Sequence, residues 1–367
     1  MSKTGLTTVP AGDIPAVNLA LRSLLAREQA IALIPPQNAA RSRATLTAIS
    51  PEQPVAENIG LVAATSGSTG EPKAVLISYD AITASISAVN EELGVIPQWH
   101  LVIPVQHIAG TMTALRGLSP ESQLHQPTIN AADPMQLAAY AKSVKDLSGL
   151  HAIALVPEHL NRLDVINELS SLRYFHKVIV GAGKLSDTLR EKLDESGVAV
   201  ISSYGLTETC GGIVWDGKPL SGVNICLNDR GEVLIQSPMN ATGYRNSDED
   251  LTTINTHDLG SFESGRLEIL GRSDNKVKVK GHFIDLNQLQ ERAAEATQNE
   301  VAALLINDEL HLVITNAELD ESKLVADLID DLGNAVKGCR IHYRDKLPRT
   351  DLGKLDLFSL RLELISD

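Results

Sequence analysis

Nine consecutive residues combine hydroxyl groups, two glycines and a lysine in an order that suits the binding of phosphate groups. They are Thr65, Ser66, Gly67, Ser68, Thr69, Gly70, Glu71, Pro72 and Lys73. Glycines let the backbone fold tightly and approach an anion, so that N–H groups, hydroxyls and the ammonium can point at phosphate oxygens. The spacing is not that of a Walker loop, which ends in Gly-Lys-Ser/Thr. Taken alone, the stretch is also compatible with a mobile Ser/Gly turn.

Four further polar segments follow this loop along the chain. They are Ser203–Glu208 (Ser-Tyr-Gly-Leu-Thr-Glu), His257–Gly260 (His-Asp-Leu-Gly), Gly271–Asp274 (Gly-Arg-Ser-Asp) and Leu347–Lys354 (Leu-Pro-Arg-Thr-Asp-Leu-Gly-Lys). Together with the loop, they resemble the signature motifs of the adenylate-forming enzymes: acyl- and aryl-CoA synthetases, luciferases and the adenylation domains of peptide synthetases. Five matches in family order, from Thr65 to Lys354, make this resemblance specific.

The resemblance implies a two-step ligase. A free carboxylate is a poor acyl donor, but its attack on the α-phosphate of ATP gives an acyl-adenylate and pyrophosphate. CoA then attacks the acyl group and AMP leaves. Such catalysis depends on positioning and on neutralising charge, and it needs no protein nucleophile. The expected cofactors and co-substrates are therefore ATP, Mg²⁺ and CoA.

By the same resemblance, individual side chains acquire roles toward ATP. Within the nucleotide-binding loop, which includes Thr65, Gly67 and Gly70, the groups expected to hold the β- and γ-phosphates are Ser66, Ser68, Thr69 and Lys73. Tyr204 is expected to stack on adenine, Thr207 to contact the α-phosphate and Glu208 to coordinate Mg²⁺. Asp258 is expected to accept hydrogen bonds from the ribose hydroxyls, and Arg272 to contact ribose or phosphate. Lys354 is expected to bridge the acid and the α-phosphate. A single carboxylate suits Mg²⁺, which shares its oxygen ligands with phosphate.

Each of these residues also has a plainer interpretation. Glu208 suits the start of a helix, Asp258 suits a turn, and Lys354 suits a solvated segment near the end of the sequence. One residue at a time, these interpretations are favoured. The ordered set of motifs favours the catalytic interpretation instead.

The segment expected to line the acid-binding site runs from Pro104 to Gly110 and contains His107. By resemblance, His107 is a wall or gate of the acyl site, although a lone histidine beside an apolar strand is usually structural. Arg116 follows on a predicted helix with Met112 and Leu115. A guanidinium can bind a second carboxylate with two parallel hydrogen bonds. The alternative is a surface arginine whose stem covers the core.

Two further segments resemble those of the o-succinylbenzoate–CoA ligases of menaquinone (vitamin K2) synthesis. The first is Leu155–Leu163, with the pattern Leu-Val-Pro-x-x-Leu-x-Arg-Leu. The second is a glycine-rich strand end expected beside the adenine and the acyl group, comprising Gly181, Ala182 and Gly183, to which Gly205 is added as a substrate-binding position. The resemblance thus implies an aromatic dicarboxylic acid as the substrate.

Composition limits the classes of partner. The formal net charge of −14 argues against binding to nucleic acid or to an anionic membrane. Hydrophobic residues make up 43%, which is ample for a core, yet no apolar run reaches the length of a membrane span. The three cysteines show no spacing typical of zinc binding or of a disulfide framework, and the first residues show no signal peptide. These features predict a cytoplasmic protein without membrane insertion; a homodimer is one option for its assembly.

The apolar pattern predicts an α/β fold. A helix is expected after Asp13, a strand over 31–34, and a buried strand over 61–64 that leads through the phosphate loop to a helix ending near Gly94. Further strands are expected at 101–103, 152–155, 178–180 and 198–201, with helical segments between them, which predicts a mostly parallel sheet covered by helices. Short antiparallel strands are expected between 211 and 270.

Two domains are predicted, 1–273 for nucleotide and acid binding and 274–367 as a mobile α+β domain that carries Lys354. Asp274 is the expected hinge. The alternation of lysine and valine over 275–281 predicts a strand with one cationic and one apolar face, which suits either a guarded sheet edge or contact with CoA phosphates. The N-terminal part is shorter than in most adenylate-forming enzymes, as in the actinobacterial o-succinylbenzoate–CoA ligases.

Two other functions are compatible with the same motifs. One is a stand-alone adenylation enzyme that loads a carrier protein, which is disfavoured because no carrier domain is attached. The other is a catalytically silent nucleotide-binding scaffold, which is disfavoured by the presence of Lys73, Glu208, Asp258 and Lys354.

Overall fold

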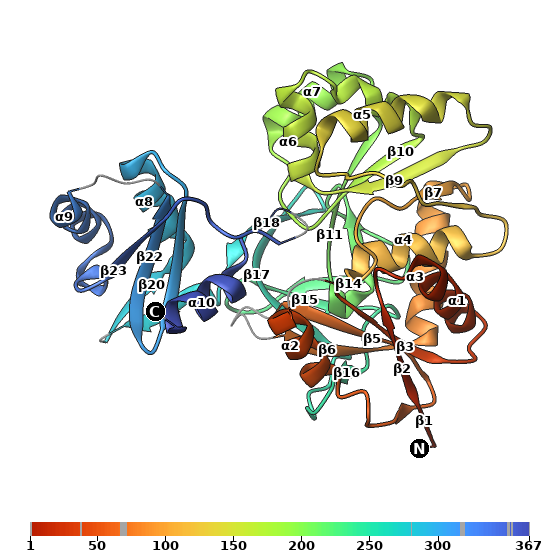
Figure 1. Cartoon of the computed structure of the whole chain (residues 1–367), viewed down its shortest axis with the longest axis horizontal. Coiled ribbons are helices and arrows are strands. Elements are labelled where there is room, and N and C mark those ends of the chain that lie inside the picture. Colours follow the sequence, from red (N-terminus) through yellow and green to blue (C-terminus); the bar gives the residue numbers. More distant parts are fainter. Residues whose placement is uncertain are drawn as a thin grey trace. The chain divides into compact units, whose positions relative to one another are not determined.

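The protein is described here from a computed structural model (Figure 1) over residues 2–36, 39–66, 72–279, 281–315, 320–350, 353 and 355–366. It forms two compact units. The first contains the described residues up to 66, Pro72–Thr256 and Gly260–Ile269; the second contains His257–Leu259 and the described residues from Leu270 onward. The sequence analysis places the boundary between residues 273 and 274, whereas the main segment of the second unit begins at Leu270. The mobility of the second unit stays a prediction.

A five-stranded sheet in the first unit carries the start of the phosphate loop. Its strand order is β16-β6-β5-β3-β2, where β2 is Leu6–Pro10, β3 Ala30–Ile34, β5 Ile59–Ser66, β6 Pro72–Ser78 and β16 Gly243–Tyr244. Strands β2, β3 and β5 are parallel, whereas β6 is antiparallel to both β5 and β16. The prediction that the loop joins a strand directly to a helix is therefore wrong. The loop joins two strands, and the helix begins only after the second.

The helices that follow these strands begin and end where local signals place them. They are α1 (Ile14–Leu25), α2 (Ala39–Ile49) and α3 (Tyr79–Leu93). The Asp13 carboxylate accepts a hydrogen bond from the Ala16 N–H, and the Ser78 hydroxyl accepts one from the Ala81 N–H, so each satisfies a backbone donor of the first turn. Helix α3 ends at Gly94, whose φ of +65° suits glycine.

A seven-stranded sheet forms the other half of the first unit. Its order is β13-β12-β11-β10-β9-β7-β8, with β7 at Gln98–His100, β8 at Leu124–His125, β9 at His151–Leu155, β10 at Lys177–Val180, β11 at Val200–Leu206, β12 at Gly211–Trp215 and β13 at Lys218–Pro219. Strands β7 to β11 pair in parallel, and β12 and β13 extend the sheet in antiparallel fashion. The predicted strand at 101–103 is wrong, because β7 already ends at His100, four residues before Pro104, which has no N–H to donate.

Helices cover both faces of this sheet. They are α4 (Ile108–Leu118), α5 (Pro134–Ser143), α6 (Pro157–Val165) and α7 (Asp187–Glu195), with short 3-10 turns η1 (Val144–Asp146), η2 (Leu169–Tyr174) and η3 (Thr207–Thr209). Met112 and Leu115 of α4 pack with Trp99 on one face, and α5, α6 and α7 supply the core on the other. Parallel strands buried on both faces are typical of this architecture.

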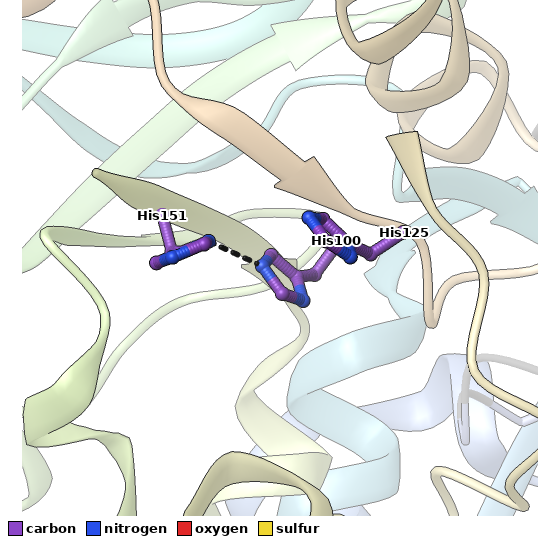
Figure 2. Close-up of side chains that lie close together, drawn as sticks. All are labelled: His100, His125 and His151. Atoms are coloured by element: carbon purple, nitrogen blue, oxygen red, sulfur yellow. Dashed lines mark hydrogen bonds between the residues drawn. The ribbon is translucent and has the colours of Figure 1, made fainter. Parts of the chain in front are cut away.

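On the α5 side of this sheet, three histidines from neighbouring strands lie close together. They are His100 of β7, His125 of β8 and His151 of β9 (Figure 2). No motif recognised in the sequence includes them.

Short antiparallel strands follow, as expected for 211–270. A four-stranded sheet has the order β14-β15-β17-β18, with β14 at Asn224–Leu227, β15 at Glu232–Gln236, β17 at Ile254–Glu263 and β18 at Arg266–Arg272. A turn at 228–231 joins β14 to β15. A small two-stranded sheet pairs β1 (Lys3–Thr4) with β4 (Val55–Ala56).

The second unit has its own apolar core and two sheets. Strands β19 (Lys276–Val279) and β20 (His282–Asp285) form one, and β21 (Val301–Ile306), β22 (Glu309–Thr315) and β23 (Arg340–Arg344) form the other; the helical elements are α8 (Leu286–Thr297), α9 (Glu321–Leu332), η4 (Asn334–Val336) and α10 (Leu357–Ser366). Lysines 276 and 278 are exposed while Val279 is buried, which confirms the predicted two-faced strand. Among the described residues, no helix is long and apolar enough to span a membrane.

Candidate active site

The described residues that flank the phosphate loop face each other across a β-ladder. Thr65 at the end of β5 is the register partner of Lys73 in β6. Lys73 is exposed and Thr65 is half-buried, so the lysine side chain is accessible to solvent. Gly67, Ser68, Thr69 and Gly70 lie outside the described residues, as does the side chain of Ser66. Their roles toward phosphate stay predictions.

The second motif lies at the end of β11 and in the 3-10 turn that follows it. Tyr204 and Gly205 belong to β11, and Thr207 and Glu208 begin η3. Gly205 is required by close packing, since a Cβ at this position would lie 2.0 Å from the carbonyl oxygen of Gly211. The motif is therefore held against β12, with its polar residues on the turn.

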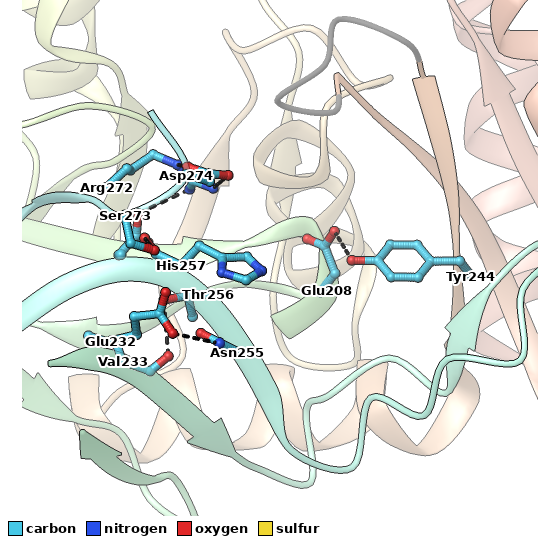
Figure 3. Close-up of polar contacts among 11 residues, drawn as sticks. Glu208, Glu232, Val233, Tyr244, Asn255, Thr256, His257, Arg272, Ser273 and Asp274 are labelled. Atoms are coloured by element: carbon cyan, nitrogen blue, oxygen red, sulfur yellow. Dashed lines mark hydrogen bonds and ion pairs between the residues drawn. The ribbon is translucent and has the colours of Figure 1, made fainter. Parts of the chain in front are cut away.

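Tyr244 connects two of the predicted site residues. Its hydroxyl donates a hydrogen bond of 2.9 Å to Glu208 Oε1 (Figure 3), and the Lys73 Nζ lies 5.1 Å from the centroid of its ring. Burial and the negative charge of Glu208 raise the pKa of Tyr244, so its hydroxyl stays protonated and able to donate at neutral pH. No sequence pattern singles out Tyr244. Only the pairing of β16 with β6, which puts Tyr244 opposite Val75, places it beside Lys73.

This arrangement fits the Mg²⁺ that the family motifs imply. One oxygen of the Glu208 carboxylate is fixed by the Tyr244 hydroxyl, and the described hydrogen bonds of this side chain leave the other for a cation. One carboxylate is a typical protein share of a magnesium site, because phosphate oxygens and water supply the remaining ligands. Lys73, on the other side of the Tyr244 ring, supplies positive charge for the phosphates.

Replacing Tyr244 with phenylalanine is expected to weaken Mg²⁺ binding without unfolding the protein. The change removes only the hydroxyl that orients Glu208, and loss of such a supporting hydrogen bond typically costs about 10- to 100-fold in metal affinity or activity. The measurement is the rate of pyrophosphate release as Mg²⁺ is titrated at fixed ATP, where the half-saturating Mg²⁺ concentration should rise about tenfold or more.

The second unit offers a matched control for this change. The Tyr343 hydroxyl donates to Glu321 Oε1 at the same distance, 2.9 Å, and neither residue belongs to a predicted site. Tyr343→Phe should leave the Mg²⁺ dependence as in the wild type. If Tyr244→Phe also leaves it unchanged, Tyr244 does not support the metal ligand.

The predicted acid-binding residues lie at the two ends of α4. His107 occupies the position before its first turn and its side chain caps no backbone N–H, while Arg116 lies in the last turn. The interpretation of Arg116 as a surface arginine is wrong, since only 8% of this residue is exposed. Its guanidinium donates to the Ser85 hydroxyl at 3.1 Å and lies 5.5 Å from the Trp99 ring centroid.

Arg116 is a buried cation that, within the described part of the chain, forms no ion pair. Its Nε is buried and has no hydrogen-bond partner there. Burial lowers its pKa to about 10, so the group still carries its charge at neutral pH. Buried charges are normally paired, because leaving one unpaired costs several kcal/mol. The Arg116 guanidinium thus keeps a buried donor that no described residue satisfies.

The glycine-rich strand end follows β10. It is adjacent to the end of β11, because these two strands pair in parallel with Val180 opposite Ser202. The left-handed backbone falls on Ala182, with a φ of +62°, rather than on either glycine. Gly181 packs against Ser203, whose carbonyl oxygen would lie 3.3 Å from an added Cβ. The fold thus brings two of the predicted segments, 181–183 and 203–208, to neighbouring strand ends.

The predicted ribose and hinge residues lie in the second unit and contact one another. Arg272 forms two hydrogen bonds of 2.7 Å with the Asp274 carboxylate and one of 3.0 Å with Asp258 Oδ1 (Figure 3). Burial raises the pKa of Asp274, but the hydrogen bonds and charge of Arg272 outweigh it and lower that pKa overall. Asp258 is buried and fixed by this pairing. The predicted catalytic Lys354 lies outside the described residues.

Comparisons with known proteins point to the same family as the order of the motifs does. The family model described as "AMP-binding enzyme" matches residues 15–245. A protein of Mycobacterium tuberculosis named "Probable 2-succinylbenzoate--CoA ligase" is 29% identical over 381 residues, covering 96% of each chain. The 2-succinylbenzoate–CoA ligase of Lactococcus lactis is 24% identical, over 84% of this chain and 71% of its own.

The fold has solved counterparts as well. The O-succinylbenzoate coenzyme A synthetase (MenE) of Bacillus subtilis, in complex with ATP and a magnesium ion, superimposes with a TM-score of 0.72 at 17% identity and covers all of this chain and 90% of its own. The fold class predicted from the sequence is thereby confirmed. Because the family model spans well over half of the sequence, the chain belongs to the AMP-binding enzyme family.

Proposed function

We propose that this protein is an ATP-dependent 2-succinylbenzoate–CoA ligase, which is the o-succinylbenzoate–CoA ligase activity of menaquinone biosynthesis. The acid reacts with ATP to give an acyl-adenylate and pyrophosphate. CoA then attacks the acyl carbon, the thioester forms and AMP leaves. The relatives named above support the reaction class, since the Mycobacterium protein aligns along nearly the full length of both chains.

The observation that most favours 2-succinylbenzoate as the substrate is the buried positive charge of Arg116. A substrate with two carboxylates presents one to ATP and must place the other somewhere in the protein. A guanidinium with an unsatisfied Nε suits that second group, because it can form charge-assisted hydrogen bonds in a site shielded from water. Its neighbour Trp99 supplies an aromatic face.

The remaining residues act by positioning and by charge. Mg²⁺, when bound to ATP, lowers the negative charge on the phosphates, and Glu208 would hold it. Tyr244 keeps the Glu208 carboxylate in place, and Lys73 adds a cation on the other side of the tyrosine ring. Asp258 would accept hydrogen bonds from the ribose while Arg272 limits its movement. This type of preorganised charge is the largest single contribution in many enzymes.

The proposed reaction also implies the other substrates of the protein and its cellular compartment. ATP and CoA are the small-molecule partners besides the acid, and the cytoplasm is the compartment that supplies both. We also predict that two copies of the protein form a homodimer.

The test is pyrophosphate release by the purified full-length protein with ATP, Mg²⁺ and CoA and one acid at a time. The panel contains 2-succinylbenzoate, benzoate and fatty acids of medium length. We expect release only with 2-succinylbenzoate, together with its CoA thioester. Pyrophosphate release with another acid would show that the proposed substrate is wrong, but it would still support the proposed reaction class. If acyl-adenylate forms but a phosphopantetheinyl carrier protein replaces CoA as the acceptor, the protein is a carrier-loading enzyme.

A further inference from the structure

The three histidines on the α5 side of the seven-stranded sheet form a compact group of nitrogen donors that includes none of the proposed active-site residues. One ring nitrogen from each of His100, His125 and His151 lies within 4.8 Å of the other two (Figure 2). The strand register produces this group. His100 is opposite His125 on β8, and Gln98, on the same face two residues earlier, is opposite His151 on β9.

Most of the group is shielded from water. His100 and His151 are buried, at 0% and 3% exposure, and Phe175 packs edge-on against the His100 ring. Burial lowers the pKa of His100 to about 3, and burial also lowers the pKa values of His125 and His151. No carboxylate in the described part of the chain shifts any of the three pKa values. Burial thus favours the neutral form of the three rings, which is the form of imidazole that binds metal ions.

Neighbouring polar groups orient the rings. Gln98 donates its amide N–H to the Ser148 carbonyl, so its amide oxygen accepts from His125 Nε2 at 2.7 Å. This places the His125 proton on Nε2 and leaves the Nδ1 lone pair unprotonated. The Tyr140 hydroxyl oxygen lies 2.5 Å from His100 Nδ1 and can accept a hydrogen bond from the N–H at that position. Metal-binding histidines typically have such a partner on the second nitrogen.

Two observations indicate that the group is incomplete as a purely internal hydrogen-bond network. His100 Nε2 and His151 Nδ1 lie 3.0 Å apart and can share only one proton. His151 Nε2 is buried and makes no hydrogen bond of good geometry among the described residues, although the backbone carbonyl groups of Leu147 and Ser148 interact with the ring. A cation between the rings would accept both facing lone pairs and let each ring carry its proton on the outer nitrogen.

We propose that His100, His125 and His151 bind one divalent transition-metal ion, Zn²⁺ by their chemistry, as a site separate from the magnesium site. Three neutral imidazoles suit Zn²⁺, with an outside ligand such as water in the fourth position, and do not suit Mg²⁺, which prefers oxygen. The His100 and His125 rings are stacked with centroids 4.4 Å apart, so His125 must turn out of the stack for its lone pair to reach the ion. His125 is only half-buried, which leaves it room to turn.

A bound ion would stabilise the edge of the sheet at β8. Strand β8 has two residues and pairs only with β7 at the edge, so a metal bond from His125 would tie this edge to β7 and β9. Zn²⁺ should therefore raise the melting temperature of the protein, because a ligand that binds only the folded state stabilises it.

The experiment is a titration of tag-free, full-length protein, first stripped with a chelator, with Zn²⁺ alone and in the presence of excess Mg²⁺. We expect one Zn²⁺ per chain, unaffected by Mg²⁺, and a rise in melting temperature. Co²⁺ in place of Zn²⁺ should give the visible absorption of a four-coordinate site. His125→Asn should weaken Zn²⁺ binding at least 10-fold and abolish the rise in melting temperature.

A second pair of histidines provides the matched control. His311 Nδ1 and His342 Nε2 lie 2.9 Å apart in the second unit, with stacked rings, but no third histidine joins them within the described residues. His342→Asn should leave Zn²⁺ binding intact. Binding that is unchanged in His125→Asn, or lost in His342→Asn, overturns the proposal, as does the absence of Zn²⁺ binding by wild-type protein. If His125→Asn unfolds, Tyr140→Phe serves instead, and it should still weaken Zn²⁺ binding.

Discussion

Replacing Lys354 with alanine is expected to lower the rate of acyl-adenylate formation by about 10²- to 10³-fold. By resemblance to the adenylate-forming enzymes, the Pro-Arg-Thr-x-x-Gly-Lys signature that ends in Lys354 is predicted to place a single ammonium between the acid and the α-phosphate during the first half-reaction only. Charge develops on both groups there, and no other lysine of the motif can substitute for it. The second half-reaction, attack of CoA on a finished acyl-adenylate, should keep nearly its full rate.

The two half-reactions are measured separately. Pyrophosphate release reports the first, and thioester formation from supplied acyl-adenylate reports the second. Lys346→Ala is the control, because Lys346 is an exposed lysine eight residues earlier in the same part of the chain and should affect neither step. Equal loss of both half-reactions in Lys354→Ala would exclude the proposed role.

Replacing Arg116 with methionine should lower kcat/KM for 2-succinylbenzoate by a factor of about 30 to several thousand. That range corresponds to the roughly 2–5 kcal/mol lost when one partner of a buried charge pair is removed. The KM for ATP should hardly change. Methionine fills a similar volume beside Trp99, and replacing a buried charge by an apolar side chain is often neutral for stability, so the variant should fold.

A pair of substrates separates recognition from a structural effect. Against an analogue that lacks the second carboxylate, wild type and Arg116→Met should have similar kcat/KM values, since that analogue forms no ion pair with residue 116 in either protein. Arg190→Met is the control variant, because Arg190 is bonded to Asp216 at 2.7 Å and serves the fold. If Arg116→Met loses the same factor with both acids, the arginine supports the structure rather than the substrate.

Local signals in the sequence located many elements well. Asp13 marks the start of α1, and the strands over 152–155 and 178–180 and the two-faced strand β19 follow directly from apolar runs and alternation. These features depend on residues within one turn or one strand of each other. The order of the motifs likewise identified the family, because it needs only the residues themselves.

The strand β6 was missed for the opposite reason. Its residues, Pro72–Ser78, follow a loop and precede a helix, and their strand character comes from pairing with β5 on one side and with β16, more than 160 residues later, on the other. A contact over that distance leaves no local pattern.

The sequence by itself determined the family and predicted which groups bind ATP, Mg²⁺ and an acid, since those groups are side chains in a recognisable order. The tertiary structure decided three other matters: the hydrogen bond from Tyr244 to Glu208, the burial of Arg116 with no ion pair to any described residue, and the meeting of His100, His125 and His151. Each depends on strand order and register. Those are set by packing over the whole first unit, so no segment of the sequence specifies them alone.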